Sequence, residues 1–131
     1  MRKAALVVSI ALISVLAATA VAAAPPKVHY RLPLTDRAVV KPKRIEFRDV
    51  DLTKIQWTGW GNRKATGTAK ASSLSCDPTC AGGDRITGTA TLKMFKRHRE
   101  GDRRFYGCLT GRIRAGKASG RIEWPPACAD R

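Results

Sequence analysis

The chain has 131 residues, and its 25 lysines and arginines outnumber its 10 acidic residues, which gives a formal net charge of +15. This length is enough for one domain and excludes two. The charge says little about the fold, but it favours polyanionic partners unless the basic side chains serve only to keep the surface soluble.

Residues 1–22 have the three parts of a secretory signal peptide. Met1-Arg2-Lys3 is a positive start, residues 4–16 form an apolar run broken only by two serines, and small residues follow. We expect cleavage after Ala20-Val21-Ala22, with Ala18-Thr19-Ala20 as the competing site. The sequence therefore predicts a secreted, extracellular protein. The alternative is an uncleaved anchor at the outer face of the cell membrane, because the segment is long enough in principle to span a bilayer.

Cleavage at this point would remove Arg2 and Lys3, which takes the formal net charge from +15 to +13. No second apolar segment approaches membrane length, so we expect no integral membrane domain after cleavage. Residues 23–42 follow as an extended leader, because they hold four of the seven prolines and show no sustained periodicity. Within this leader, His29-Tyr30-Arg31-Leu32 could either pack against an edge of the domain or stay loose.

From residue 43 onward, short segments alternate between two faces and are separated by turn signals. The segment 86–95 is the clearest, and the small residues of 64–71 indicate a strand that a neighbour approaches closely. No amphipathic helix of normal length interrupts them, so residues 43–131 are predicted to be an all-β domain, an antiparallel β-sandwich or barrel of about six strands. The predicted strands are 43–49, 52–57, 64–71, 86–95, 105–113 and 119–124.

Two tryptophans stand beside glycines at the end of the second of these segments. Exposed indole rings could stack on a sugar, which would make Trp57 and Trp60 a platform for a carbohydrate or protein ligand. Core packing is the preferred interpretation, because an indole buries roughly 150–250 Å². The chain has only three tryptophans, two tyrosines and three phenylalanines with which to build its core.

All four cysteines lie after residue 75, as expected for a disulfide-stapled domain in an oxidising compartment. Three pairings are possible, and proximity favours Cys76–Cys80 and Cys108–Cys128. A zinc site is the alternative, but the second half of the chain lacks the paired spacing of a zinc ribbon, and no histidine lies near the cysteines in sequence. We therefore expect no metal and no cofactor.

The connection between the fourth and fifth predicted strands is strongly basic. On a hairpin tip its cations would project together and could bind phosphate or sulfate groups, which the planar guanidinium of arginine contacts bidentately. Outside the cell the available anions are wall polymers, acidic polysaccharide, lipid head groups and extracellular nucleic acid, and the alternative is a merely solvated tip. The predicted anion-binding patch comprises Lys93, Lys96, Arg97, Arg99, Arg103 and Arg104.

Catalysis has little support in the sequence. The Gly-x-Ser-x-Gly motif of a nucleophilic serine is absent. A small secreted hydrolase could use His98 with Glu46 or Glu123 for acid–base chemistry, but nothing in the spacing brings these residues together. We expect a non-enzymatic protein that associates with an anionic extracellular surface or polymer, with a ligand-binding module and a hydrolase as the alternatives.

Three motifs of the chain resemble a known group of proteins. They are Trp57-x-x-Trp60-Gly61, Ala65-Thr66-Gly67-Thr68 and Cys76-Asp77-Pro78-Thr79-Cys80-Ala81-x-Gly83. The pattern is similar to that of small secreted actinobacterial proteins of uncharacterised function, and the likeness covers about residues 43–113. It implies export and a β domain, and it supplies no catalytic residues. Those proteins often have a cysteine in the first strand, where this chain has Phe47 and Arg48, so the pairing of Cys108 with Cys128 stays open here.

Overall fold

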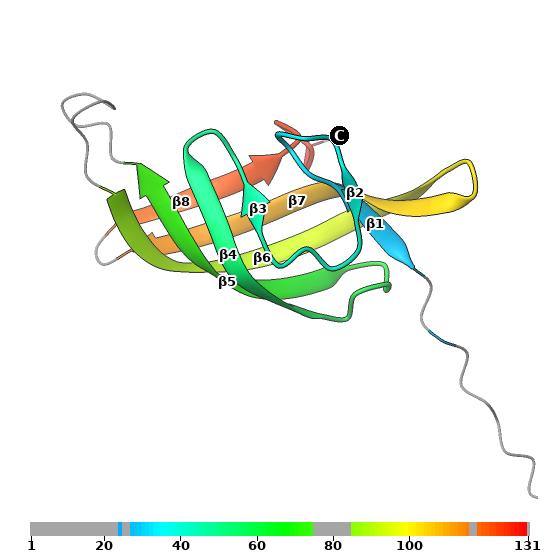
Figure 1. The fold of residues 1–131 in the computed structure, drawn as a ribbon, viewed down its shortest axis with the longest axis horizontal. Helices are drawn as coiled ribbons and strands as arrows, with labels where there is room; N and C mark the ends of the chain where they lie inside the picture. Colours follow the sequence, from blue (N-terminus) through cyan, green and yellow to red (C-terminus); the bar gives the residue numbers. More distant parts are fainter. Residues whose placement is uncertain (1–23, 25–26, 75–84, 116–117, 131) are drawn as a thin grey trace, which may run out of the picture.

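The computed structural model describes residues 24, 27–74, 85–115 and 118–130 (Figure 1). The predicted signal peptide, residues 1–22, and the predicted Cys76–Cys80 disulfide lie outside these described residues. Among the described residues, no helix is long and apolar enough to cross a membrane.

The described strands form one sheet in the spatial order β2-β1-β7-β6-β5-β4-β3, and β8 pairs with β7 (Figure 1). Every neighbouring pair is antiparallel except β1 with β7. The strands are β1 (Val28–Arg31), β2 (Ala38–Val39), β3 (Ile45–Glu46), β4 (Val50–Thr58), β5 (Ala65–Leu74), β6 (Arg85–Glu100), β7 (Arg103–Ala115) and β8 (Ala118–Trp124).

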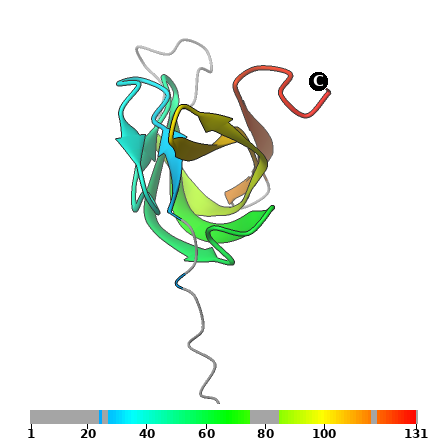
Figure 2. The same cartoon turned by 90° about the vertical axis from the view of Figure 1, so that its right-hand side faces the viewer.

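From β3 to β8, consecutive strands pair in an antiparallel meander. β1 breaks this pattern because it runs parallel to the start of β7, with Val28 opposite Arg104. β8 pairs further along the same edge of β7, from Leu109 to Ala115. Seen end-on, the sheet curls around its core as a half-barrel (Figure 2). The all-β prediction is confirmed, but the described strands form one mixed sheet and not the two antiparallel layers of a sandwich.

The segment that the sequence assigns to an extended leader, residues 23–42, supplies two strands of this sheet. Val28 and Tyr30 of β1 are buried in the core, and His29 and Arg31 lie on the opposite face. Four alternating residues near several prolines are too few to reveal a period of two, which is why the sequence left open whether this stretch packs against the domain and did not assign it to a strand. The folded unit therefore includes residues from Val28 onward, and its boundary is not at residue 43.

The core fills the concave side of the curled sheet, and glycines on β5 and β6 allow close approach there. A methyl group on Gly67 would lie 2.7 Å from the Trp57 ring, and one on Gly88 would lie 2.1 Å from the carbonyl oxygen of Arg114. The prediction that a neighbour approaches residues 64–71 closely is thus confirmed, and the neighbour is the ring of Trp57, which lies against Gly67. The buried core comprises Val28, Tyr30, Ile45, Leu52, Ile55, Trp60, Ala65, Ala69, Ala71, Ala90, Leu92, Met94, Tyr106, Leu109, Ile113 and Ile122.

A disulfide joins the C-terminal tail to the sheet. Cys108 on β7 is bonded to Cys128, with their Cα atoms 5.6 Å apart, and both residues are buried. This confirms the pairing that proximity in sequence favours. The Lys96 amine donates a hydrogen bond to the carbonyl oxygen of Cys128 at 2.5 Å, so the tail also contacts β6.

Candidate anion-binding site

The β6–β7 hairpin is longer than the sequence predicts, and it projects beyond the rest of the sheet (Figure 1). Strand pairing continues as far as Glu100 opposite Arg103, and Gly101 takes a positive φ of 61° in the turn. From Lys96 to Glu100 every residue is exposed. Burial therefore no longer alternates between the two faces in this part of β6, although the backbone pairing continues. Much of the basic segment that the sequence predicts to be a connection between strands is part of β6 and β7.

Along β7, the alternation of core-facing and outward-facing side chains shifts by one residue near the base of this hairpin. Tyr106 and Leu109 both lie in the core although they are three residues apart. Between them, Gly107 lies beside Lys96, which has a positive φ of 55°. A side chain on Gly107 would lie 3.0 Å from the carbonyl oxygen of Lys96. The register of β6 with β7 is the same on both sides of this point, and it sets Arg97 opposite Tyr106, next to the turn that follows β4.

Four hydrogen bonds between this turn and other elements hold it in place. The Trp60 indole N–H donates to a β1 carbonyl at 2.8 Å. The Tyr106 hydroxyl accepts from the Gly61 N–H at 2.9 Å and donates to the Asn62 carbonyl at 2.6 Å. The Arg97 guanidinium donates to the Gly61 carbonyl at 2.6 Å. Burial raises the pKa of Tyr106, so its hydroxyl keeps the proton that it donates.

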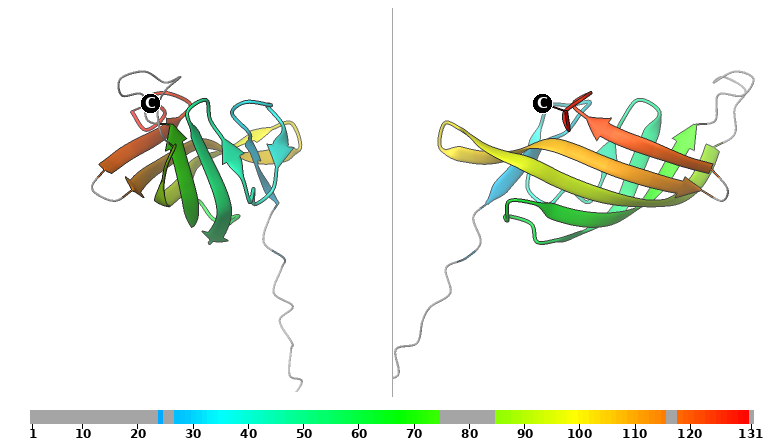
Figure 3. Two further views of the ribbon diagram at one scale, coloured as in Figure 1. Left: turned by 60° about the vertical axis from the view of Figure 1, so that its left-hand side comes forward. Right: turned by 180° about the vertical axis from the view of Figure 1, so that it is seen from behind.

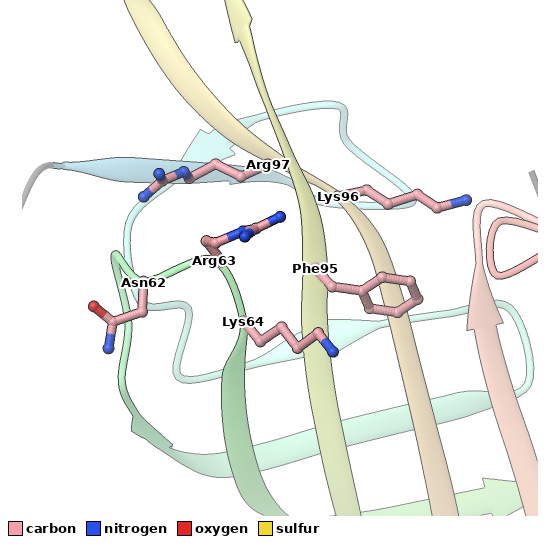
Figure 4. Close-up of a pocket in the computed structure, with 6 residues that line it drawn as sticks. All are labelled: Asn62, Arg63, Lys64, Phe95, Lys96 and Arg97. Atoms are coloured by element: carbon pink, nitrogen blue, oxygen red, sulfur yellow. The ribbon is translucent and has the colours of Figure 1, made fainter.

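A groove of about 980 Å³ lies between this turn and β6 (Figure 4). Arg63 and Lys64 reach from the turn toward β6, and the ring of Phe95 supplies an apolar surface beside them. The lining includes four cations and no carboxylate. We call this feature the basic groove, and its lining residues are Asn62, Arg63, Lys64, Phe95, Lys96 and Arg97.

The structure places three of the six predicted patch residues at or beside the basic groove. Lys96 and Arg97 line it, and the Lys93 amine lies 5.4 Å from the centroid of the Phe95 ring. Sequence reasoning missed the other side of the groove, residues 62–64. Their polar and basic run directly after the Trp-Gly turn is a usable signal, but its place next to β6 follows only from the pairing of β5 with β6.

The other three predicted patch residues lie on the projecting hairpin and do not line the groove. Arg99 faces Arg104, and Arg103 faces Glu100. The hairpin is tied to β1, because the Arg31 guanidinium donates to the Glu100 carboxylate at 2.5 Å. The predicted patch is therefore divided between two places, and the Glu100 carboxylate in its hairpin part is paired with Arg31 and His98 and not with a patch arginine.

His98 has different partners from those of the predicted hydrolase. Its Nε2 atom lies 3.0 Å from the Glu100 carboxylate, and its ring stacks against Phe105 with the centroids 6.0 Å apart. Glu46 on β3 is ion-paired with a nearby arginine, and Glu123 on β8 accepts a backbone N–H from the tail. No hydrogen bond or ion pair between described residues joins His98 to Glu46 or Glu123.

The two tryptophans of the predicted ligand platform pack against each other with their ring centroids 4.9 Å apart. Trp60 is only 7% exposed and meets the Tyr106 ring edge-on. Trp57 is partly buried, and its indole N–H donates to the Pro42 carbonyl at 2.8 Å. These positions agree with the core-packing interpretation and leave Trp60 no open ring face for a sugar.

No group of three or more histidine, cysteine or acidic side chains is placed to hold a metal ion in the part of the chain that the structure describes. Comparison with known protein families, with curated proteins and with solved structures finds no match to the chain. The function is therefore inferred from the geometry of the basic groove.

Proposed function

We propose that the protein is an exported, non-enzymatic domain whose basic groove binds an anionic polymer. The observation that carries this proposal is the lining of the groove. Four cations from two separate segments line it, and the lining residues include no carboxylate. Lys96 and Arg97 extend to opposite sides and donate to carbonyl groups of the protein, whereas Arg63 and Lys64 reach toward β6 (Figure 4). Uncompensated positive charge in a hollow raises the local concentration of anions and speeds their association.

The side chains of the groove suit repeated acidic groups. The guanidinium of Arg63 can contact a sulfate, phosphate or carboxylate bidentately, while Lys64 acts as a point charge next to it. The hydrogen bonds from Tyr106 and Arg97 hold the turn before binding. A site that is already ordered loses less entropy when its ligand binds.

Export is supported by two separate features. The start of the chain has the parts of a signal peptide. The Cys108–Cys128 disulfide is of a kind that persists in oxidising compartments. The polymers within reach of an exported protein are wall polymers, acidic polysaccharide and extracellular nucleic acid.

The test measures binding to heparin, as a model polyanion, over a range of salt concentrations. Arg63→Ala with Lys64→Ala should weaken binding and reduce the slope of log K against log salt by about one to two, because each lost contact removes slightly less than one released counterion. The control is Arg37→Ala with Lys43→Ala, which removes the same charge from exposed positions outside the groove.

The control variant should keep a slope close to that of the wild type. If both double variants lose affinity equally, only the net charge matters, and the basic groove has no role. If the wild-type protein elutes from heparin at the low salt of a neutral protein, the proposed function is wrong.

A further inference from the structure

Three cross-strand rows cover the outer face of β6, β7 and β8, which lie side by side (Figure 3, right). The apolar residues of these strands, such as Leu92 and Ile113, are buried on the opposite face. The residues of the rows are exposed or partly exposed. The rows are Thr89, Arg114 and Ser119; Thr91, Arg112 and Arg121; and Lys93, Thr110 and Glu123.

Two arginines face each other at the centre of this surface. Arg112 on β7 lies directly opposite Arg121 on β8. Like charges in this position destabilise a sheet. Lys93 and Arg114 flank the pair, and none of these four cations forms an ion pair with a carboxylate of the described residues. The acid in the rows, Glu123, already accepts a hydrogen bond from the tail at 2.8 Å.

The surface is hollowed around this arginine pair. Two shallow hollows of about 320 and 230 Å³ are both lined by Arg112 and Arg121. The smaller hollow also reaches Lys93, whose amine lies over the ring of Phe95. Because Phe95 lines the basic groove, the arginine pair and the groove belong to one continuous surface across β6.

We propose that Arg112 and Arg121 form a second anion-binding site, and that this site and the basic groove together make a track for an acidic polysaccharide. This inference rests on the proposed function and names its ligand as a glycan that carries sulfate or carboxylate groups. An external anion between the opposed arginines would relieve their repulsion, as no carboxylate of the described residues does.

The composition of the rows favours a glycan over nucleic acid. Hydroxyl groups of threonine and serine stand beside the cations in each row, which suits a chain that is rich in both hydroxyl and acidic groups. Single-stranded nucleic acid is held by aromatic side chains on which successive bases stack. The nine row positions contain no aromatic residue, and Phe95 is the one aromatic residue that lines the basic groove, so the track offers no series of rings for successive bases.

The experiment measures the affinity of the protein for a heparin-derived dodecasaccharide in about 0.15 M NaCl and the dependence of this affinity on salt. Arg112→Gln with Arg121→Gln should bind about tenfold more weakly and lose about one to two from the salt slope, as expected for two exposed ionic contacts. Arg112→Lys with Arg121→Lys should keep the slope and bind only a few-fold more weakly, because charge remains but the bidentate geometry is lost. Arg37→Gln with Lys43→Gln is the matched control and should bind as the wild type does.

The unfolding temperature of the glutamine variant separates lost contacts from lost structure. Since the substitution removes an opposed pair of like charges, this temperature should equal or exceed that of the wild type. A lower temperature, or wild-type affinity in the glutamine variant while Arg63→Ala with Lys64→Ala binds weakly, would overturn the second site alone. Wild-type affinity in both variants would overturn the proposed function as well. Tighter binding of an oligothymidylate of equal charge would overturn the assignment to a glycan.

Discussion

Two buried tyrosine hydroxyls lie in contrasting surroundings. The Tyr30 hydroxyl has no hydrogen-bond partner among the described residues, although Tyr30 is only 2% exposed. Burial raises the pKa of Tyr30 far above its ordinary value. The Tyr106 hydroxyl instead bonds to Gly61 and Asn62 and so holds the turn that supplies half of the basic groove. A buried polar atom costs free energy when it lacks a partner, so these two hydroxyls should affect stability in opposite directions.

Replacing each tyrosine with phenylalanine tests this contrast. Tyr30→Phe should raise the free energy of unfolding by about 1 kcal/mol, because it removes a buried hydroxyl that has no partner. Tyr106→Phe should lower it by about 1–3 kcal/mol, because the buried Gly61 N–H loses its acceptor. Urea denaturation of the two variants and the wild type measures both changes. A loss of stability in Tyr30→Phe equal to that in Tyr106→Phe would contradict the difference between the two sites.

At the scale of single elements, a side-chain tether joins the β6–β7 hairpin to β1 in addition to the pairing of β1 with β7. The hydrogen bond from the Arg31 guanidinium lowers the pKa of the Glu100 carboxyl, and the hydrogen bond from His98 lowers it further. The Arg31 side chain also lies over the Phe105 ring, with its guanidinium carbon 4.8 Å from the centroid. This contact joins the start of the described chain to the hairpin.

The tether should weaken in acid. A carboxyl whose pKa is lower in the folded protein stabilises the fold above its ordinary pKa of 4.5, and this contribution is lost as the pH falls through the lowered value. Arg31→Ala should bring the pKa of Glu100 back toward 4.5, and His98→Ala should move it less. An NMR titration of the Glu100 carboxyl measures these values. A larger shift in His98→Ala than in Arg31→Ala would show that the tether has been assigned to the wrong cation.

The elements that sequence reasoning found are those with a clear period of two. Residues 86–95 alternate over ten positions and lie in β6, whereas β1 has four residues and β2 has two. Elements this short are fixed by the strand that they join, and not by their own pattern. The extension of β6 past Phe95 was missed for another reason: beyond the core both faces are charged, so pairing persists without periodicity.

The half of the basic groove that β6 supplies could be predicted from the sequence. Lys96 and Arg97 stand out in sequence as part of a dense basic run. Arg63 and Lys64 come close to them only because β5 pairs with β6, which places the turn before β5 beside these cations. The pair formed by Arg112 and Arg121 depends likewise on the register of β7 with β8. Charges that meet through strand register leave no local signal in the sequence.

For the whole molecule, the Cys108–Cys128 disulfide stabilises the fold by closing a loop with a sequence separation of 20 residues. Cys108→Ala with Cys128→Ala should lower the free energy of unfolding by about 3 kcal/mol, mainly because the unfolded chain becomes less constrained. Chemical denaturation with and without a reducing agent measures this loss. Reductant should bring the wild type close to the variant, and a variant as stable as the oxidised wild type would show that the crosslink contributes nothing.

The parallel pairing of β1 with β7 has a consequence for the order in which the protein is made. Val28 meets a partner that lies 76 positions further along the chain, so β1 has no neighbour on this side until β7 has emerged from the ribosome or the export channel. Local hairpins from β3 onward can close earlier, because their loops are shorter. The earliest of the described strands to be synthesised is thus among the last to be seated, and until then the edge of β1 that β7 will cover is open to unwanted association with other chains.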